Sequence, residues 1–162
     1  MDRKQSENKK ILNATPLEYD GITFKSKLEV TCYKVLKEKG VNPKYEGKIF
    51  TLWEGFSPTV PFYTKNSFKK GNYKLDLLSP KTAIDKRKVG AWHYTPDFYF
   101  IYGKFIIYVE IKGFSNDVYG YKRKLFRKLL EKLQKEDTEH QYEFWEIYSK
   151  VQLVECLEHL KI

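Results

Sequence analysis

The apolar positions of the chain are densest in the stretch YTPDFYFIYGKFIIYVEIKGF, residues 94–114. The pattern predicts two strands, 97–102 and 105–112, joined by a turn at Gly103 and Lys104. Glycine at the first turn position favours a type II′ turn, which closes a two-residue hairpin. Because nearly all other side chains here are apolar or aromatic, both faces of the hairpin are expected to be covered.

Three charged residues interrupt this apolar hairpin. A two-residue turn makes the numbers of paired residues sum to 207, so Asp97 is predicted to lie opposite Glu110. Their β-carbons would then be about 5 Å apart. Lys112 follows Glu110 by two residues and is expected on the same face of the sheet. The sequence therefore predicts two acids and a lysine at one end of the hairpin.

The remaining apolar pattern predicts helices over residues 25–40, 119–136 and 150–162, and strands over 44–53 and 142–149. The order along the chain is then helix, three strands, helix, strand, helix. Strands flanked by helices in this order favour an α/β fold in which helices cover a mixed sheet.

The segment 119–136 is expected to form an amphipathic helix. Its apolar face is predicted from residues that recur every four positions, with Leu130 beside them: Tyr121, Leu125, Leu129 and Leu133. The last helix is expected to begin after Ser149, which has capping-box spacing to Gln152.

The length of 162 residues suits one domain with a core of its own. We expect a flexible N-terminal arm over residues 1–20 and a single domain over 21–162. Residues 54–92 are rich in lysine, proline and glycine and are interpreted as a basic insertion between the first and second strands. An irregular stretch of this length inside a small domain is usually functional, and it has room for a short hairpin of its own.

The net charge of +9 is unevenly distributed. Residues 55–92 hold eight Lys or Arg against two acids, a net charge of +6, and residues 119–136 hold seven against two, a net charge of +5. Residues 137–162 hold two against six, a net charge of −4. Positive charge gathered in two segments favours a polyanion such as DNA as the partner.

The cysteines and the polar N-terminus indicate the compartment. Cys32 and Cys156 lie in different predicted helices, without a CxxC motif or a nearby histidine, and are interpreted as small core residues in a reducing compartment. The first thirteen residues lack the apolar centre of a signal peptide. No apolar run reaches the roughly eighteen residues of a membrane helix. We therefore expect a cytoplasmic protein without membrane association.

The predicted Asp97–Glu110 pair raises a question of chemistry. Two facing carboxylates repel each other and are costly to desolvate. The pair can share a proton, or it can bind a divalent cation, for which ligands that are all oxygen favour Mg²⁺ or Mn²⁺ over zinc. The alternative is a structural ion pair in which Lys112 neutralises one of the acids.

The residues TPDF, the thirteen-residue interval from Asp97 to Glu110 and the sequence EIK together resemble the signature of the PD-(D/E)xK nuclease superfamily. The segment FKSKLEVTCYKVL resembles the first helix of its branch of phage endonuclease I and Holliday-junction-resolvase-like enzymes. The S-x-L-E, Y-x-P-D-F and E-x-K layout is also similar to the endonuclease subunit of heteromeric transposases. Phage-encoded proteins of unassigned function share still more, and the resemblance spans roughly residues 24–160. It implies a restriction-endonuclease-like core.

Carried over residue by residue, the resemblance implies that Asp97 and Glu110 bind Mg²⁺, with Mn²⁺ as a substitute and one or two ions in the site. The backbone carbonyl of Ile111 would be a third ligand. Lys112 would be the catalytic lysine, a compact cation beside the scissile phosphate that stabilises developing charge or orients the attacking water.

Glu29, on the first helix, would be an additional acid that binds or positions a metal ion. Ser26 and Glu29 also have the spacing of a capping box. A purely structural role for Glu29 at the start of the helix therefore stays open.

Two basic surfaces are expected to contact the DNA backbone and read its shape rather than its sequence. The first is a band on the 119–136 helix: Lys122, Arg123, Lys124, Arg127 and Lys128. The second belongs to the insertion and the residue that follows it: Lys86, Arg87, Lys88, Trp92 and His93. The alternative for both is an ordinary solvated surface.

The activity implied by the resemblance is Mg²⁺-dependent hydrolysis of DNA phosphodiester bonds. The expected substrate is branched DNA, such as a Holliday junction, in phage recombination or DNA processing in the host-cell cytoplasm. A resolvase cuts two strands symmetrically, which implies a homodimer. Two alternatives stay open: a nicking or transposase-type nuclease, and a non-catalytic nucleic-acid-binding or host-interaction protein with the same fold.

Overall fold

The fold is known from a computed structural model, which describes residues 16–60, 88–113 and 117–162. The chain forms two compact units. The first contains the described residues up to Phe50 and from Tyr94 to Ile162, and the second contains those within Thr51–His93. The first unit is a mixed α/β structure that holds all three helices of the described chain.

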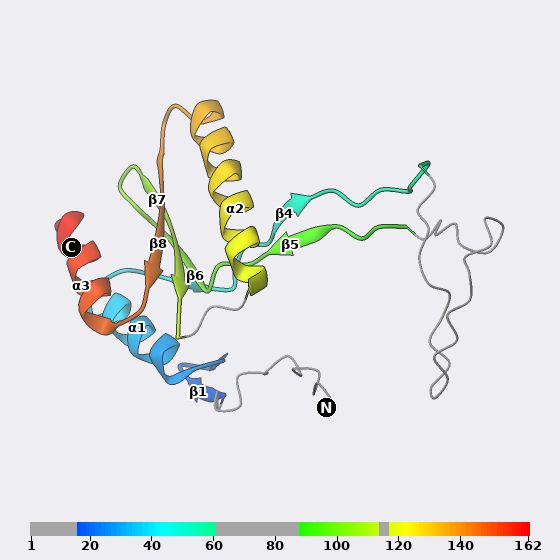
Figure 1. The fold of residues 1–162 in the computed structure, drawn as a ribbon. Coiled ribbons are helices and arrows are strands. Elements are labelled where there is room, and N and C mark those ends of the chain that lie inside the picture. The colour runs from blue at the N-terminus through cyan, green and yellow to red at the C-terminus, as the bar shows by residue number, and fades with distance from the viewer. Residues whose placement is uncertain (1–15, 61–87, 114–116) are drawn as a thin grey trace, which may run out of the picture. The chain divides into compact units, whose positions relative to one another are not determined.

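A four-stranded mixed sheet forms the centre of the first unit (Figure 1). Its strand order is β3 (Lys44–Tyr45), β6 (Phe98–Tyr102), β7 (Phe105–Ile111) and β8 (Gln141–Ile147). The pairs β3–β6 and β6–β7 are antiparallel, and β7–β8 is parallel. The expectation of a mixed sheet between helices is confirmed.

The β6–β7 hairpin has the predicted register. Phe98 pairs with Val109 and Tyr102 with Phe105, so the numbers sum to 207. Gly103 has a φ of +54° while Lys104 does not have a positive φ, which is the φ pattern of a type II′ turn. Asp97 lies one residue before β6 and is therefore next to the first pair of the ladder.

Helices cover both faces of this sheet (Figure 1). Helices α1 (Lys27–Glu38) and α3 (Lys150–His159) pack on one face, where they enclose the main core. Core residues from this face include Cys32, Leu36, Phe98, Ile107, Trp145, Leu153 and Leu157. Helix α2 (Asp117–Glu136) covers the other face, where the Phe126 ring contacts Tyr94, Tyr108 and Phe144. The alternating side chains of β7 and β8 thus have an apolar environment on both sides.

Serine residues begin α1 and α3 as expected from their spacing. The Ser26 hydroxyl accepts a hydrogen bond from Glu29 N–H at 3.2 Å, and the Ser149 hydroxyl accepts one from Gln152 N–H at 3.3 Å. The Gln152 side chain in turn accepts the Tyr148 N–H at 2.8 Å. Both cysteines are free thiols, with Cys32 buried and Cys156 half-buried.

The predicted apolar face of α2 is right only in part. Tyr121 is 64% exposed, and the other members of the four-residue repeat are only half-buried: Leu125, Leu129 and Leu133. Leu130 is buried as predicted, and Tyr119 and Phe126 are the other buried positions. A strict four-residue repeat drifts by about 40° per step around a helix of 3.6 residues per turn, so it leaves the core within two turns.

The predicted N-terminal arm is too long at its C-terminal end. Strands β1 (Leu17–Tyr19) and β2 (Ile22–Phe24) form an antiparallel hairpin, and residues 1–15 lie outside the described chain. Both turn residues, Asp20 and Gly21, have positive φ, at 54° and 71°. Asp-Gly is the signature of a tight type I′ hairpin turn, and the fully buried Phe24 ties this hairpin to the core.

The single strand predicted over 44–53 is two strands, β3 and β4 (Phe50–Trp53). The break occurs at Glu46, which has a φ of +45° and donates its N–H to the Asp97 carbonyl at 2.8 Å. At Gly47 a β-carbon would lie 3.0 Å from both the Tyr99 ring and the Lys44 β-carbon, so only glycine fits without a shift. The chain therefore turns here instead of continuing one strand.

The second unit is a two-stranded ribbon in its described part. Strand β4 pairs with β5 (Trp92–Tyr94), and Phe56 and Val89 form an antiparallel bridge further along. The residues interpreted as an insertion, 54–92, belong to this unit, although residues 61–87 lie outside the described chain. None of the helices in the described ranges is both long and apolar enough to cross a membrane.

Candidate active site

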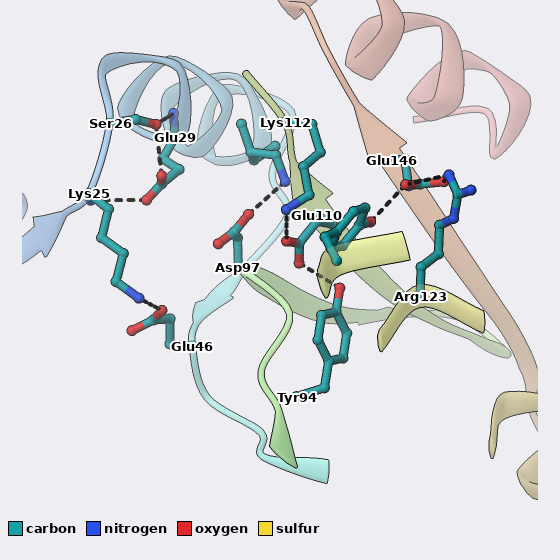
Figure 2. A network of polar contacts seen from close by, with 12 residues as sticks. Lys25, Ser26, Glu29, Glu46, Tyr94, Asp97, Glu110, Lys112, Arg123 and Glu146 are labelled. Carbon is teal, nitrogen blue, oxygen red and sulfur yellow. Dashed lines mark hydrogen bonds and ion pairs between the residues drawn. The ribbon is translucent and has the colours of Figure 1, made fainter. Parts of the chain in front are cut away.

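The charged residues of the β6–β7 hairpin gather where β6 begins and β7 ends (Figure 2). Asp97 comes from the residue before β6, Glu110 from the penultimate position of β7, and Lys112 from the residue after β7. Glu29 comes from the first turn of α1. Figure 2 shows the carboxylates of Asp97 and Glu110 side by side, with Lys112 beside Glu110. The structure thus brings the four predicted residues into one neighbourhood.

Asp97 is held in an environment that disfavours its negative charge. Its Oδ2 accepts the Ile111 N–H at 2.6 Å. Burial and then the negative charge of Glu110 raise the pKa of Asp97 to about 8, and the charge of Glu29 adds to the rise. The Ile111 hydrogen bond and the Lys112 charge act in the opposite direction without cancelling the effect. Burial and the two neighbouring acids therefore outweigh Lys112 and the Ile111 hydrogen bond in their effect on the pKa of Asp97.

Glu110 is one of two buried charged residues among the described residues, with 6% of its surface exposed. Lys112 Nζ lies 2.6 Å from Oε1, and the Tyr94 hydroxyl donates to Oε2 at 2.5 Å. Burial, followed by the charge of Glu110, raises the pKa of Tyr94 far above its usual range, so the hydroxyl remains a donor. These two contacts fix the orientation of the Glu110 carboxylate.

Lys112 lies between an acid and an aromatic ring. Its ammonium group is 3.6 Å from the centroid of the Tyr119 ring, a cation–π contact on the side of α2. The Tyr119 hydroxyl donates to Glu146 Oε1 at 2.7 Å, and Arg123 lies 3.2–3.3 Å from both Glu146 oxygens. Glu146 on β8 is the register partner of Glu110 on β7. The contacts of Tyr119 and Arg123 with Glu146 therefore extend the polar network from β7 to β8.

Glu29 has the contacts of a structural residue. Its carboxylate accepts the Ser26 hydroxyl at 2.7 Å, the Lys25 N–H at 3.0 Å and the Tyr45 hydroxyl at 2.7 Å. These hydrogen bonds stabilise the N-terminal end of α1. The backbone donor is the Lys25 N–H and not the Ser26 N–H of a standard capping box. Glu29 also acts on the pKa of Asp97, so its charge is felt at the hairpin acids.

The fit of this donor set to a metal ion rests on the two hairpin acids. Within the described ranges there is no group of three acidic, histidine or cysteine side chains arranged to hold a metal ion. Asp97 and Glu110 nevertheless supply hard oxygen donors, and each carboxylate oxygen has two acceptor positions, so the contacts of Lys112 and Tyr94 do not exhaust Glu110. The carbonyl of Ile111, the last residue of β7, stays a predicted third ligand.

The predicted basic band on α2 divides into two groups. Lys124, Arg127 and Lys128 are exposed, whereas Lys122 is half-buried. Arg123 is bound to Glu146 instead of being free for phosphate. A hollow of about 310 Å³ between α2 and β8 is bordered by Arg127 and Glu146.

The predicted basic residues of the insertion are described only in part. Lys88 and His93 are exposed residues of the second unit. Lys86 and Arg87 lie outside the described residues.

Three residues of the network were missed in the sequence: Tyr94, Tyr119 and Glu146. Tyr94 lies three residues before Asp97, and the hydroxyls of Tyr94 and Tyr119 reach the buried Glu110 and the half-buried Glu146 across long sequence separations. The sequence feature that could have indicated them is a tyrosine in an apolar segment, because a buried tyrosine hydroxyl usually has a hydrogen-bond partner.

The chain was compared with protein-family models, curated proteins and solved structures. The family model described as "Protein of unknown function (DUF1064)" matches residues 9–147. The chain belongs to the DUF1064 family. The DUF1064 match includes Glu29, Asp97, Glu110 and Lys112 and both elements of the hairpin. No curated protein and no solved structure matches.

Proposed function

We propose that this DUF1064 chain is a Mg²⁺-dependent DNA endonuclease of the PD-(D/E)xK type. The observation that carries the proposal is the pair of the half-buried Asp97 and the buried Glu110, with the Lys112 ammonium 2.6 Å from Glu110. Burial, and then repulsion from Glu110, raise the pKa of Asp97 to about 8, and a bound divalent cation would relieve the repulsion between the two acids. The mixed sheet between helices supports a restriction-endonuclease-like core.

The residues have distinct chemical tasks in this proposal. When bound, Mg²⁺ (or Mn²⁺, as one or two ions) would acidify water and polarise the phosphoryl oxygen. Asp97, Glu110 and the Ile111 carbonyl would hold it, and Glu29 would adjust the charge of the site. Lys112 would place its ammonium against the phosphate, where it stabilises negative charge that grows in the transition state.

The buried tyrosines support a rigid arrangement of these groups. The Tyr94 hydroxyl donates to one oxygen of Glu110 at 2.5 Å, and the Tyr119 ring lies 3.6 Å from the Lys112 ammonium. Hydrogen-bonded donors and acceptors that are held in place lose little free energy to reorganisation during a reaction.

Charge supports DNA as the substrate. The chain carries +9 overall, and Lys124, Arg127 and Lys128 are exposed on the same helix that contributes Tyr119. Branched DNA, cut in phage recombination or DNA processing within the host-cell cytoplasm, is the substrate that the resemblance favours. A homodimer would follow from paired incisions, and a nicking or transposase-type activity would follow from single ones.

A second candidate function is a non-catalytic DNA-binding or host-interaction protein. It is favoured by the contacts of Lys112 and Glu29, which complete an ion pair and a helix start without any ligand. In that case the hairpin acids would only stabilise the fold.

Cleavage of labelled DNA distinguishes the two functions. Duplex, single-stranded and four-way-junction DNA are incubated with the protein in Mg²⁺ or in EDTA, next to Glu110→Gln and Lys112→Met. Matched controls are Glu158→Gln on α3 and Lys104→Met in the hairpin turn, which remove the same charges from exposed positions. The nuclease proposal expects Mg²⁺-dependent cutting that is lost in the first two variants and kept in the controls. Absence of cutting in Mg²⁺ on every substrate would reject it.

A further inference from the structure

The β4–β5 ribbon of the second unit exposes large aromatic side chains. Trp53 is 54% exposed, Trp92 is 45% exposed and Phe56 is 48% exposed. Each of these belongs to a strand or to the bridge that extends the two strands. Contiguous exposed apolar side chains of this size indicate an interaction surface.

The two indoles come from the two paired strands of the ribbon, Trp53 at the end of β4 and Trp92 at the start of β5. Phe56 pairs with Val89, and a β-carbon on Gly55 would lie 2.9 Å from the Ala91 nitrogen and 3.2 Å from the Gly90 carbonyl carbon. Trp53 and Trp92 are the strand residues next to this bridge, so both indoles lie at the same end of the two-stranded ladder.

The ribbon is a sheet of only two strands, β4 and β5, within the part of the chain that the structure describes. A two-stranded hairpin alone is marginally stable in water, and it gains stability when a partner covers its face. The exposed rings and the short ladder together indicate that the ribbon is completed by binding.

Charge identifies the kind of partner. Residues 51–93, the second unit, carry eight Lys or Arg against three acids, a net charge of +5. A second copy of the same unit would bring like charges together. A polyanion that also offers flat apolar surfaces satisfies both the charge and the rings.

We propose that the β4–β5 ribbon binds unpaired nucleotides of DNA, whose bases stack on Trp53 and Trp92. Stacking needs the open face of a base, which a fully paired duplex offers only at its ends, whereas a single strand or an opened branch offers it throughout. Lys88, an exposed cation of the same unit, binds a phosphate of the strand. The inference rests on the proposed function for its choice of DNA and narrows the substrate to DNA with unpaired bases.

Tryptophan fluorescence tests the proposal because the chain has three tryptophans and Trp145 is only 7% exposed. Acrylamide quenching of the full chain in EDTA reports mainly on Trp53 and Trp92. An oligo(dT) single strand is expected to protect both indoles from quenching. A DNA hairpin whose bases are all paired except for a short loop is expected to protect them much less. Protection that appears without DNA and rises with protein concentration would mean that a second copy covers the ribbon and would overturn the proposal. Protection by anionic phospholipid vesicles but not by oligo(dT) would overturn it as well.

The role of the two indoles is tested with variants, whose binding to fluorescein-labelled oligo(dT) in EDTA is measured by fluorescence anisotropy. The double variant Trp53→Ala/Trp92→Ala is expected to bind at least tenfold more weakly, since stacking is worth about 1–3 kcal/mol per base. The double variant to phenylalanine keeps a ring at each position and is expected to stay within about threefold of the wild type. Equal binding by the alanine variant, with its fold verified by circular dichroism, would contradict the stacking role.

The nuclease proposal and the ribbon inference can be tested independently of each other. Glu110→Gln is expected to lose cleavage in Mg²⁺ and to keep oligo(dT) binding in EDTA. Absence of cleavage by the wild type on every substrate, together with intact, tryptophan-dependent binding, would reject the nuclease and leave the ribbon inference standing. Mg²⁺-dependent cleavage without any protection of the tryptophans by oligo(dT) would reject the ribbon inference and leave the nuclease proposal standing.

Discussion

The Lys112 ammonium lies 3.6 Å from the centroid of the Tyr119 ring. This ring belongs to α2 and is held by its hydroxyl, which donates to Glu146. The candidate catalytic lysine is therefore placed by a helix as well as by its own strand. A cation above an aromatic face that is shielded from solvent gains about 2 kcal/mol, compared with about 0.5–1 kcal/mol at exposed sites.

Two substitutions at Tyr119 separate the ring from the hydroxyl. Tyr119→Phe keeps the cation–π contact and loses one hydrogen bond, so it is expected to cost about 1 kcal/mol of stability and to keep most of any cleavage activity. Tyr119→Leu removes the ring and is expected to lower the cleavage rate more than tenfold. Urea unfolding and single-turnover cleavage measure the two effects. Equal activity of both variants would show that the ring does not position Lys112.

Asp97 is expected to make the stability of the metal-free protein depend on pH. Its pKa rises from 3.8 in the unfolded chain to about 8 in the folded one, so between these values the folded state holds a proton that the unfolded state releases. Its contribution to the free energy of unfolding is therefore full below about pH 3.8 and is lost as the pH rises through about 8. Glu110, Glu29 and Lys112 are the charged groups that act on it.

Urea unfolding in EDTA at pH 5, 7 and 9 measures this dependence. The stability of the wild type relative to Asp97→Asn is expected to fall from pH 5 to pH 9, because the amide has no proton to lose. A difference that does not change with pH would mean that Asp97 titrates near its ordinary value.

Glu29 offers a test between capping and chemistry. Glu29→Ala leaves the Lys25 N–H and the hydroxyls of Ser26 and Tyr45 without their acceptor, and each such buried loss costs about 1–3 kcal/mol. Glu29→Gln keeps an acceptor oxygen and removes the charge, so it is expected to cost less stability. If Glu29 also serves the site, Glu29→Gln lowers the cleavage rate at temperatures where it is fully folded. Activity equal to the wild type in folded Glu29→Gln would leave only the capping role.

The exposed and the bound members of the α2 band are expected to behave differently. Replacing Lys124, Arg127 and Lys128 by glutamine is expected to weaken DNA binding and to reduce the slope of log K against log salt by up to about 3, near 0.9 for each phosphate contact. Arg123→Gln is expected instead to reduce stability, because it leaves Glu146 with only its hydrogen bond from Tyr119. Anisotropy at four salt concentrations measures the slope. An unchanged slope in the triple variant would remove α2 from the DNA interface.

The hairpin at the site could be predicted because its information is local. Gly103 specifies a two-residue turn, and that turn fixes every pair of the β6–β7 ladder, including the position of Asp97 next to Glu110. The start of α1 at Ser26 and of α3 at Ser149 is local in the same sense, since each cap bonds to an N–H three residues on.

Features that depend on distant partners were not predicted. Arg123 was assigned to phosphate because the sequence shows its charge, while its binding to Glu146 depends on how α2 packs on β8. The break after Tyr45 depends on contacts of Glu46 and Gly47 with β6, some fifty residues later. The Asp20–Gly21 turn is different, since its type I′ signal was present in the sequence and was overlooked.

Asp97 and Glu110 are proposed to bind the cation that DNA hydrolysis requires. Binding is tested by the single-turnover rate of four-way-junction cleavage as Mg²⁺ is titrated into protein freed of metal with EDTA, for the wild type, Asp97→Asn and the control Glu158→Gln. We expect a rate that rises from zero to saturation with Mg²⁺ in the wild type and the control, and a loss of at least a hundredfold in Asp97→Asn. The same rate in Asp97→Asn as in the wild type, or cutting that persists in EDTA, would contradict this proposal.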